Sequence, residues 1–405
     1  MSQAANRPDD HDTAPRPTAR TGRVAIKPFA GLIEAVVVDE PVTFSFPGSV
    51  SRTSAMAGWT WIYRDLCSDI IAADDVLEGR LTPTALEPLL PQIMTRIKEG
   101  LSVADASPDS RMRLRAMLGS DEARDALPVM LAALRARHLL AKAQAFGKAV
   151  NTIGDDNALG VALQSMPLQD PPLAALLFHA AMGQVINPTR LVTTIIKLSG
   201  NANETSVARN GFGPLVDAML AHAQNQLHLL QPGGAFADVD LICRALERFH
   251  RLVRALTGYM EFERGSRWAQ VLAALTKQVS ERIEPRLREV VPDINFALRR
   301  GREGSIDRLD NDRILAAING VYLLATVREC RDSMALNATF DQAWGQSAEA
   351  LEMHLQRNLD LLRANPADQV VGARIDAAIK MAEVRFNPEY AETLRRARAS
   401  AERRV

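Results

Sequence analysis

The sequence predicts an all-α protein, either an irregular multi-helix bundle or a short α-solenoid, that follows a disordered N-terminal tail and a short extended or β-hairpin arm. Three observations lead to this fold class. Long amphipathic segments recur from residue 51 onward. A β-branched, alternating pattern is confined to residues 23–50. The preceding segment, residues 1–22, is rich in Pro, Asp, Arg and Thr, which is typical of disorder.

The tail, residues 1–22, lacks the apolar core of a secretory signal peptide. The three cysteines, Cys67, Cys243 and Cys330, are an odd and widely spaced set, which argues against both a disulfide framework and a structural zinc site. We therefore expect reduced thiols in a cytoplasmic protein. Export by a specialised secretion machine that reads disordered N-termini stays open.

The arm, residues 23–50, holds a β-branched run that ends at Val38, a turn candidate at Asp39-Glu40-Pro41, and then an alternating segment. An isolated two-stranded ribbon is only marginally stable in water, so the arm should lie on another surface. That surface is either a partner protein or the chain's own helices. In the first case the partner-binding side chains are Val36, Val38, Val42, Phe44 and Phe46.

Helices are expected from Ser51 onward, and several have clear start signals. Thr82-Pro83 and Ser107-Pro108 each combine an N-cap residue with proline at the first helical position. A single helix is expected over residues 120–150, with His138 on its apolar face as a core histidine. Prolines 285 and 292 should kink or divide the segment 265–300.

Two later segments have the strongest helical periodicity. The apolar spacing of the first runs 4, 3, 4, 3, 4, which places six side chains on one face of a helix; its members are Ile242, Leu246, Phe249, Val253, Leu256 and Met260. The second stripe consists of Trp344, Ala348, Leu351, Leu355, Leu359 and Leu362. Such faces must be buried against other helices.

A polar connection at residues 199–213 is the best boundary candidate within the helical body. The sequence thus predicts an N-terminal helical subdomain over residues 51–200 and a C-terminal bundle of long helices over residues 201–405.

Charge and hydropathy restrict the partners. The chain has 48 Lys and Arg residues and 48 Asp and Glu residues, so no global field draws it to nucleic acid or to an anionic membrane. The longest mostly apolar stretch, residues 172–186, is shorter than the roughly 20 residues of a membrane helix. We therefore expect neither general nucleic-acid binding nor a membrane span, whereas a homo-oligomer stays open. The richness in Ala, Arg and Leu is typical of bacterial proteins.

One acidic motif points to metal chemistry. Asp74, Asp75 and Glu78 form a D-D-x-x-E pattern, and paired carboxylates can hold Mg²⁺ and through it a diphosphate. The five residues resemble the aspartate-rich motif of all-α isoprenoid synthases. That resemblance implies a Mg²⁺-dependent lyase or transferase with a second metal-binding motif. The nearest candidate for that motif, Asn311-Asp312, lacks further oxygen ligands at the expected turns.

One basic cluster points to an anion. Arg299, Arg300 and Arg302 lie together around Gly301, and guanidinium groups recognise phosphate or acidic groups. This pattern indicates either a regulatory domain that binds a small anionic ligand or solvated charges near a helix end.

No catalytic constellation accompanies these motifs: the cysteines have no histidine and acid beside them in sequence, and no G-x-S-x-G elbow is present. We therefore predict a non-enzymatic interaction, adaptor or scaffold protein without a cofactor, which presents helical faces and the N-terminal arm to protein partners. The alternatives are the Mg²⁺-dependent enzyme and the anion-binding regulatory domain.

Overall fold

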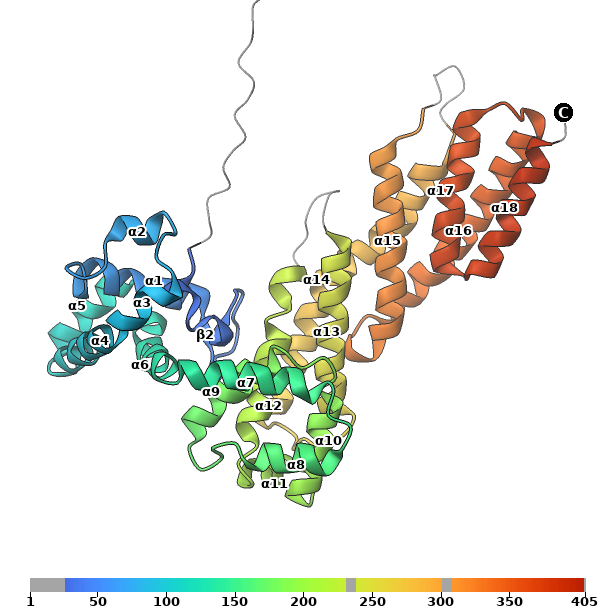
Figure 1. Cartoon of the computed structure of the whole chain (residues 1–405). Helices are drawn as coiled ribbons and strands as arrows, with labels where there is room; N and C mark the ends of the chain where they lie inside the picture. Colours follow the sequence, from blue (N-terminus) through green and yellow to red (C-terminus); the bar gives the residue numbers. More distant parts are fainter. Residues whose placement is uncertain (1–25, 231–237, 301–307, 404–405) are drawn as a thin grey trace, which may run out of the picture.

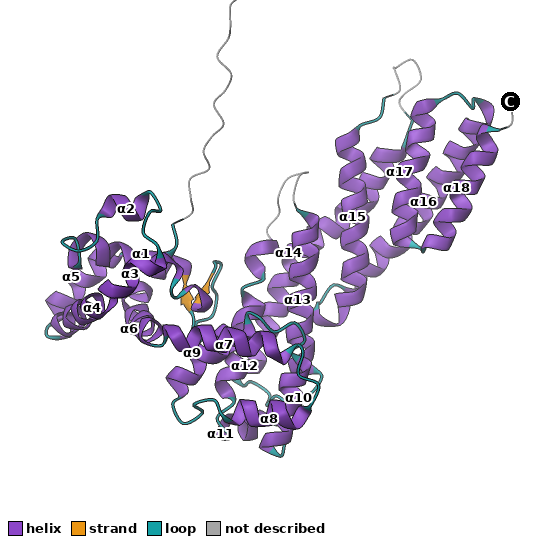
Figure 2. Ribbon diagram, in the orientation of Figure 1, coloured by secondary structure: helices purple, strands orange, loops and turns teal. Residues whose placement is uncertain are grey.

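The described part of the chain is mostly helical, as its periodicity predicts. A computed structural model describes residues 26–230, 238–300 and 308–403. Three helical groups follow one another in space: α1 to α6, then α7 to α12, then α13 to α18 (Figure 1). Strands contribute only one short pair beside α1 within these described ranges (Figure 2).

The first group begins with the arm and ends in a set of short helices. Its elements are η1 (Pro28–Gly31), η2 (Glu34–Val36), β1 (Val37–Val38), β2 (Val50–Ser51), α1 (Arg52–Trp61), η3 (Ile62–Leu66), α2 (Ala73–Leu77), α3 (Pro83–Leu86), η4 (Glu87–Leu89), α4 (Leu90–Asp105), α5 (Pro108–Leu118) and α6 (Asp121–Arg135). The predicted caps are confirmed, since Thr82 accepts a hydrogen bond from the Ala85 amide and Ser107 accepts one from the Ser110 amide.

The middle group surrounds one very apolar helix, α9. Its elements are α7 (Arg137–Val150), α8 (Asp156–Gln164), α9 (Pro171–Met182), α10 (Thr189–Ser199), α11 (Glu204–Arg209), α12 (Gly213–Gln224) and η5 (Leu227–Leu230). A helix that is apolar on all sides must be buried, and all nine residues from Ala174 to Met182 are buried.

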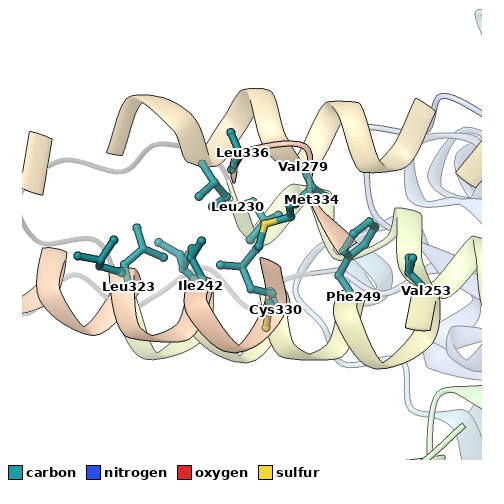
Figure 3. Packing of buried hydrophobic residues seen from close by; sticks show 14 of the residues in the cluster. Leu230, Ile242, Phe249, Val253, Val279, Leu323, Cys330, Met334 and Leu336 are labelled. Carbon is teal, nitrogen blue, oxygen red and sulfur yellow. The ribbon is translucent and has the colours of Figure 1, made fainter. Parts of the chain in front are cut away.

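The third group contains the longest helices. Its elements are α13 (Val239–Thr257), α14 (Arg267–Leu298), α15 (Asn311–Cys330), η6 (Arg331–Ser333), α16 (Asn337–Ala364), α17 (Gln369–Arg385) and α18 (Pro388–Glu402). The predicted stripe from Ile242 to Met260 is confirmed, because all six of its side chains are at most 5% exposed. Figure 3 shows Ile242 and Phe249 of α13 packed in one apolar layer with Cys330 of α15 and Val279 of α14.

Helix α9 joins the two hydrophobic cores of the molecule. Its residues Phe178 and Met182 belong to the larger core, which extends to the C-terminal helices. Its residues Leu177 and Ala181 belong to the smaller core, which is built on α1, α4 and α6. The predicted boundary near residue 200 therefore stays a prediction, and the cores themselves meet on α9.

The arm folds onto the chain's own helices, and the predicted hairpin does not occur. Its first part forms the short 3-10 helices η1 and η2, and only the part from Val37 onward is extended. Val37 and Val38 pair in parallel with Val50 and Ser51, with no antiparallel partner after the turn at residues 39–41. The segment between these strands crosses the end of α12. There the buried side-chain amide of Gln224 makes the hydrogen bonds to the arm's backbone that a neighbouring strand would otherwise make. Its Oε1 accepts hydrogen bonds from the backbone amides of Thr43 (3.1 Å) and Phe44 (2.8 Å), and its Nε2 donates to the Phe44 carbonyl (3.0 Å).

We expect Gln224→Leu to lower the free energy of unfolding by about 2 kcal/mol, because it leaves two amides and a carbonyl of the arm without partners in a partly buried site. Gln278→Leu is the matched control, since Gln278 hydrogen-bonds to the exposed Thr43 hydroxyl of the same arm and to none of its backbone groups among the described residues. Urea denaturation of both variants measures the difference. Equal stabilities would contradict the role of Gln224 in holding the arm.

Two linked predictions, the single helix over residues 120–150 and the core position of His138, were wrong. The helix expected over residues 120–150 breaks at Ala136, whose φ of −88° and ψ of 5° end α6 before α7 begins. The break shifts the helical phase, so His138 is 74% exposed beside Glu87 instead of lying in the core.

The segment 265–300 is not divided, since α14 runs through Pro285 and Pro292. Both prolines lie on its exposed side. Water can therefore hydrogen-bond to the backbone carbonyls that they leave without a partner.

Candidate functional site

The site with the clearest binding character is an apolar groove between η3, α4 and α5. The first wall comes from a π-helical turn that continues α1. The Cys67 amide donates to the carbonyl of Ile62, five residues earlier, at 2.8 Å. π-Helical turns are rare and frequently occur at functional sites. This one brings Asp65 and Leu66 into the groove beside Trp61.

The other two walls are the facing sides of an antiparallel helix pair. Along α4 the lining residues follow helical spacing; they are Arg96, Glu99, Gly100, Val103 and Ala104. Along α5 they follow the same spacing; they are Ser110, Arg113, Leu114 and Met117. Residues three, four and seven apart share one helical face, so each helix presents a continuous stripe to the groove.

The cavity between these walls has a volume of about 580 Å³. Trp61 and Leu114 are buried, whereas Val103 and Met117 are 65% and 55% exposed. A Cβ atom at position 100 would lie 3.0 Å from the Trp61 ring, so glycine there keeps space for the indole. The size and apolar lining fall within the range of ordinary binding sites.

Arg96 brings no net charge to the groove. It forms a bidentate ion pair with Asp69, with Nη2 to Oδ2 at 2.7 Å, and donates to the Leu66 carbonyl at 2.7 Å. Hydrogen bonding to Arg96 lowers the pKa of the Asp69 carboxyl from its usual 3.8. Behind this pair, burial raises the pKa of the Cys67 thiol, which keeps Cys67 a packing residue.

The remaining charges of the groove lack partners. Asp65 and Glu99 project from the η3 and α4 side, and Arg113 projects from α5. In the described part of the chain, none of the three forms an ion pair or a side-chain hydrogen bond. The rim thus carries its free acidic groups on η3 and α4 and its free basic group on α5.

The predicted arm residues lie on the chain itself. Val36, Val38 and Phe46 are at most 4% exposed, and Phe44 packs partly buried against the larger core. Val42 is the most accessible of the five, at 36%. Binding of a partner by these side chains stays a prediction, and four of the five are already covered by intramolecular contacts.

Asp74 and Asp75 of the acidic motif lie on α2, and Glu78 directly follows the last residue of this helix. Asp75 pairs with Arg80 at 2.8 Å, and Glu78 also pairs with Arg80. Asp74 is exposed. Among the described residues, no three His, Cys, Asp or Glu side chains lie close enough together to hold a metal ion.

The basic motif is only partly described. Arg299 and Arg300 are exposed at the end of α14, and the Arg299 guanidinium stacks over the Phe296 ring at 4.3 Å. Arg302 lies outside the described residues. The structure therefore places Arg299 against an aromatic ring, and anion binding by this motif stays a prediction.

Sequence reasoning missed the groove, although one signal was present. On α5 the buried stripe needs only Leu114 and Leu118, yet Met112 and Met117 are also apolar and 68% and 55% exposed. Apolar residues beyond those that the core requires indicate a surface that contacts something else.

No helix in the described ranges has the length and hydropathy needed to cross a membrane. Comparison of the chain with known protein families, with curated proteins and with solved structures finds no match.

Proposed function

We propose that this chain is an adaptor or scaffold that binds a protein partner in the groove between η3, α4 and α5. The observation that carries the proposal is the 580 Å³ apolar groove, with Val103 and Met117 exposed at its edge. The proposed activity is binding.

The chemistry of the groove suits a protein surface. Exposed apolar side chains beside a cavity mark interaction sites, because covering them removes apolar area from water. Methionine side chains are flexible and adapt to different partners. Trp61 forms a rigid aromatic floor, and buried tryptophans are frequent anchor points of interfaces.

The arm supports this role indirectly. Its hydrogen bonds to Gln224 and the donation of Arg267 to the Ser45 carbonyl at 2.9 Å tie the N-terminal helices to the rest of the chain. A scaffold must hold its binding surface on a rigid framework. The arm then contributes by positioning the groove.

We expect the double variant Val103→Glu, Met117→Glu to lose a stoichiometric partner that the wild-type chain retains on purification from its own organism. A carboxylate at either position would have to be desolvated on binding, which costs several kcal/mol when no partner charge is present. Mass spectrometry of the co-purified proteins measures the loss.

Matched controls are Val161→Glu and Met353→Glu. Val161 and Met353 are 67% and 53% exposed and lie on α8 and α16, outside the groove. The partner should remain with both controls. A partner that stays with the groove variant, or no partner with any form, contradicts the proposal.

A further inference from the structure

The groove has the form of a binding site for a third helix. Two antiparallel helices present parallel stripes, and a helix laid along them would pack its side chains into the space between the stripes. Peptides recognised in this way carry apolar residues at i, i+3 or i+4, and i+7.

The segments of this chain outside the described residues lack the apolar composition that such a helix needs. Residues 1–25 contain only two large apolar residues, Met1 and Val24, which are too far apart to share a stripe. Residues 231–237 and 301–307 contain one large apolar residue each, Phe236 and Ile306. An apolar stripe needs several such residues at helical spacing.

Charge defines the occupant further. Because Arg96 is neutralised by Asp69, the rim retains Asp65 and Glu99 from η3 and α4 and Arg113 from the facing helix α5. A helix with two basic flanks would repel Arg113, and a helix with two acidic flanks would repel both carboxylates. Only a helix with one basic and one acidic flank matches both sides.

Resting on the proposed function, we infer that the groove receives an amphipathic helix from a different protein, with a basic residue on one flank and an acidic residue on the other. Its apolar stripe would cover Trp61, Leu114 and Met117. Its basic flank would face Asp65 and Glu99, and its acidic flank would face Arg113. Reversal of the helix direction exchanges the flanks, so their charges also set its orientation.

Four labelled helical peptides of about 18 residues test this inference. All carry the same leucine stripe, and their flanks are Lys and Glu, Lys and Lys, Glu and Glu, or Gln and Gln. Fluorescence anisotropy with the full chain measures each dissociation constant. We expect the mixed peptide to bind about fivefold more tightly than either like-charged peptide, and the preference to fade at about 1 M salt.

Arg113→Glu gives a second, independent readout. It makes the whole rim acidic, so the preference should move to the Lys and Lys peptide, while the affinity for the Gln and Gln peptide stays unchanged. Because Arg113 is exposed and without an ion pair in the described part of the chain, the variant should fold normally.

The outcomes separate the inference from the proposed function. If all four peptides bind equally to wild type and to Arg113→Glu, the charge pattern is wrong, whereas helix binding in the groove stands. If none binds, or if Val103→Glu does not weaken binding, the groove does not bind a helix and the inference fails, whereas the proposed function is decided by the purification experiment. If sedimentation shows a dimer that Val103→Glu dissolves, a second copy of this chain fills the groove and the inference is overturned.

Discussion

Gly147→Ala is expected to destabilise the chain by about 3 kcal/mol and to lower its thermal midpoint by about 4 °C. A Cβ atom at this position of α7 would lie 2.1 Å from the carbonyl oxygen of Ala181 on α9. Because the obstacle is backbone, no side-chain rotation relieves the clash, and the two helices must separate. Since α9 belongs to both hydrophobic cores, separation disturbs the junction between them.

Gly345→Ala is the matched control for this substitution. Gly345 also lies inside a helix, but a Cβ atom there meets nothing within 4 Å. Alanine should therefore stabilise α16 by about 0.5–1 kcal/mol through its helix propensity. If Gly147→Ala stabilises the chain as Gly345→Ala does, α7 and α9 do not touch as described.

Acid is expected to weaken the same junction through a pair of histidines. The rings of His179 on α9 and His222 on α12 stack with centroids 4.4 Å apart, and His222 Nε2 is 2.9 Å from the His179 carbonyl. Nδ1 of His179 is buried and has no hydrogen-bond partner. Arg248 of α13 donates to the Met182 carbonyl at 2.7 Å and adds a positive charge nearby.

Burial is the main cause that lowers both histidine pKa values, to about 4 for His222 and well below 6.5 for His179. The folded state therefore resists protonation, whereas the unfolded chain protonates near pH 6.5. Stability is retained above pH 6.5 and falls as the pH drops toward the folded pKa. Between pH 6.5 and about pH 5, His222 alone should account for about 2 kcal/mol.

Urea denaturation between about pH 7 and pH 5 measures this dependence. His222→Gln keeps a hydrogen-bond donor near the His179 carbonyl but cannot titrate, so its stability should change about half as much with pH. His138→Gln, which removes an exposed imidazole, is the control. A His222→Gln profile that parallels the wild-type profile would remove this pair as the cause.

Local features of the sequence predicted local structure well. The stripe from Ile242 to Met260 is buried as expected, because apolar spacing is a property of one helix and needs no knowledge of its neighbours. The same reasoning failed at His138, where a single residue, Ala136, leaves helical geometry and resets the phase. Nothing in the alanine-rich sequence there marks the break.

Contacts between residues far apart in the chain could not be predicted from the sequence pattern. The arm was expected as an extended or hairpin segment, but the atoms that hold Thr43 and Phe44 belong to Gln224, about 180 positions away. The groove likewise combines residues from Trp61 to Met117 on three elements. Val103 and Met117 have the same apolar character as core residues, and the fold shows that both are more than half exposed.

Site-specific photocrosslinking from position 103 tests the central claim most directly. A photoreactive phenylalanine analogue at residue 103, compared with the same analogue at the equally exposed residue 161, would be activated in cells of the source organism. We predict an adduct from position 103 alone, joined to a segment of a different protein with apolar residues at helical spacing. Adducts only within this chain, or equal adducts from both positions, would contradict the assignment of the groove as a partner-binding site.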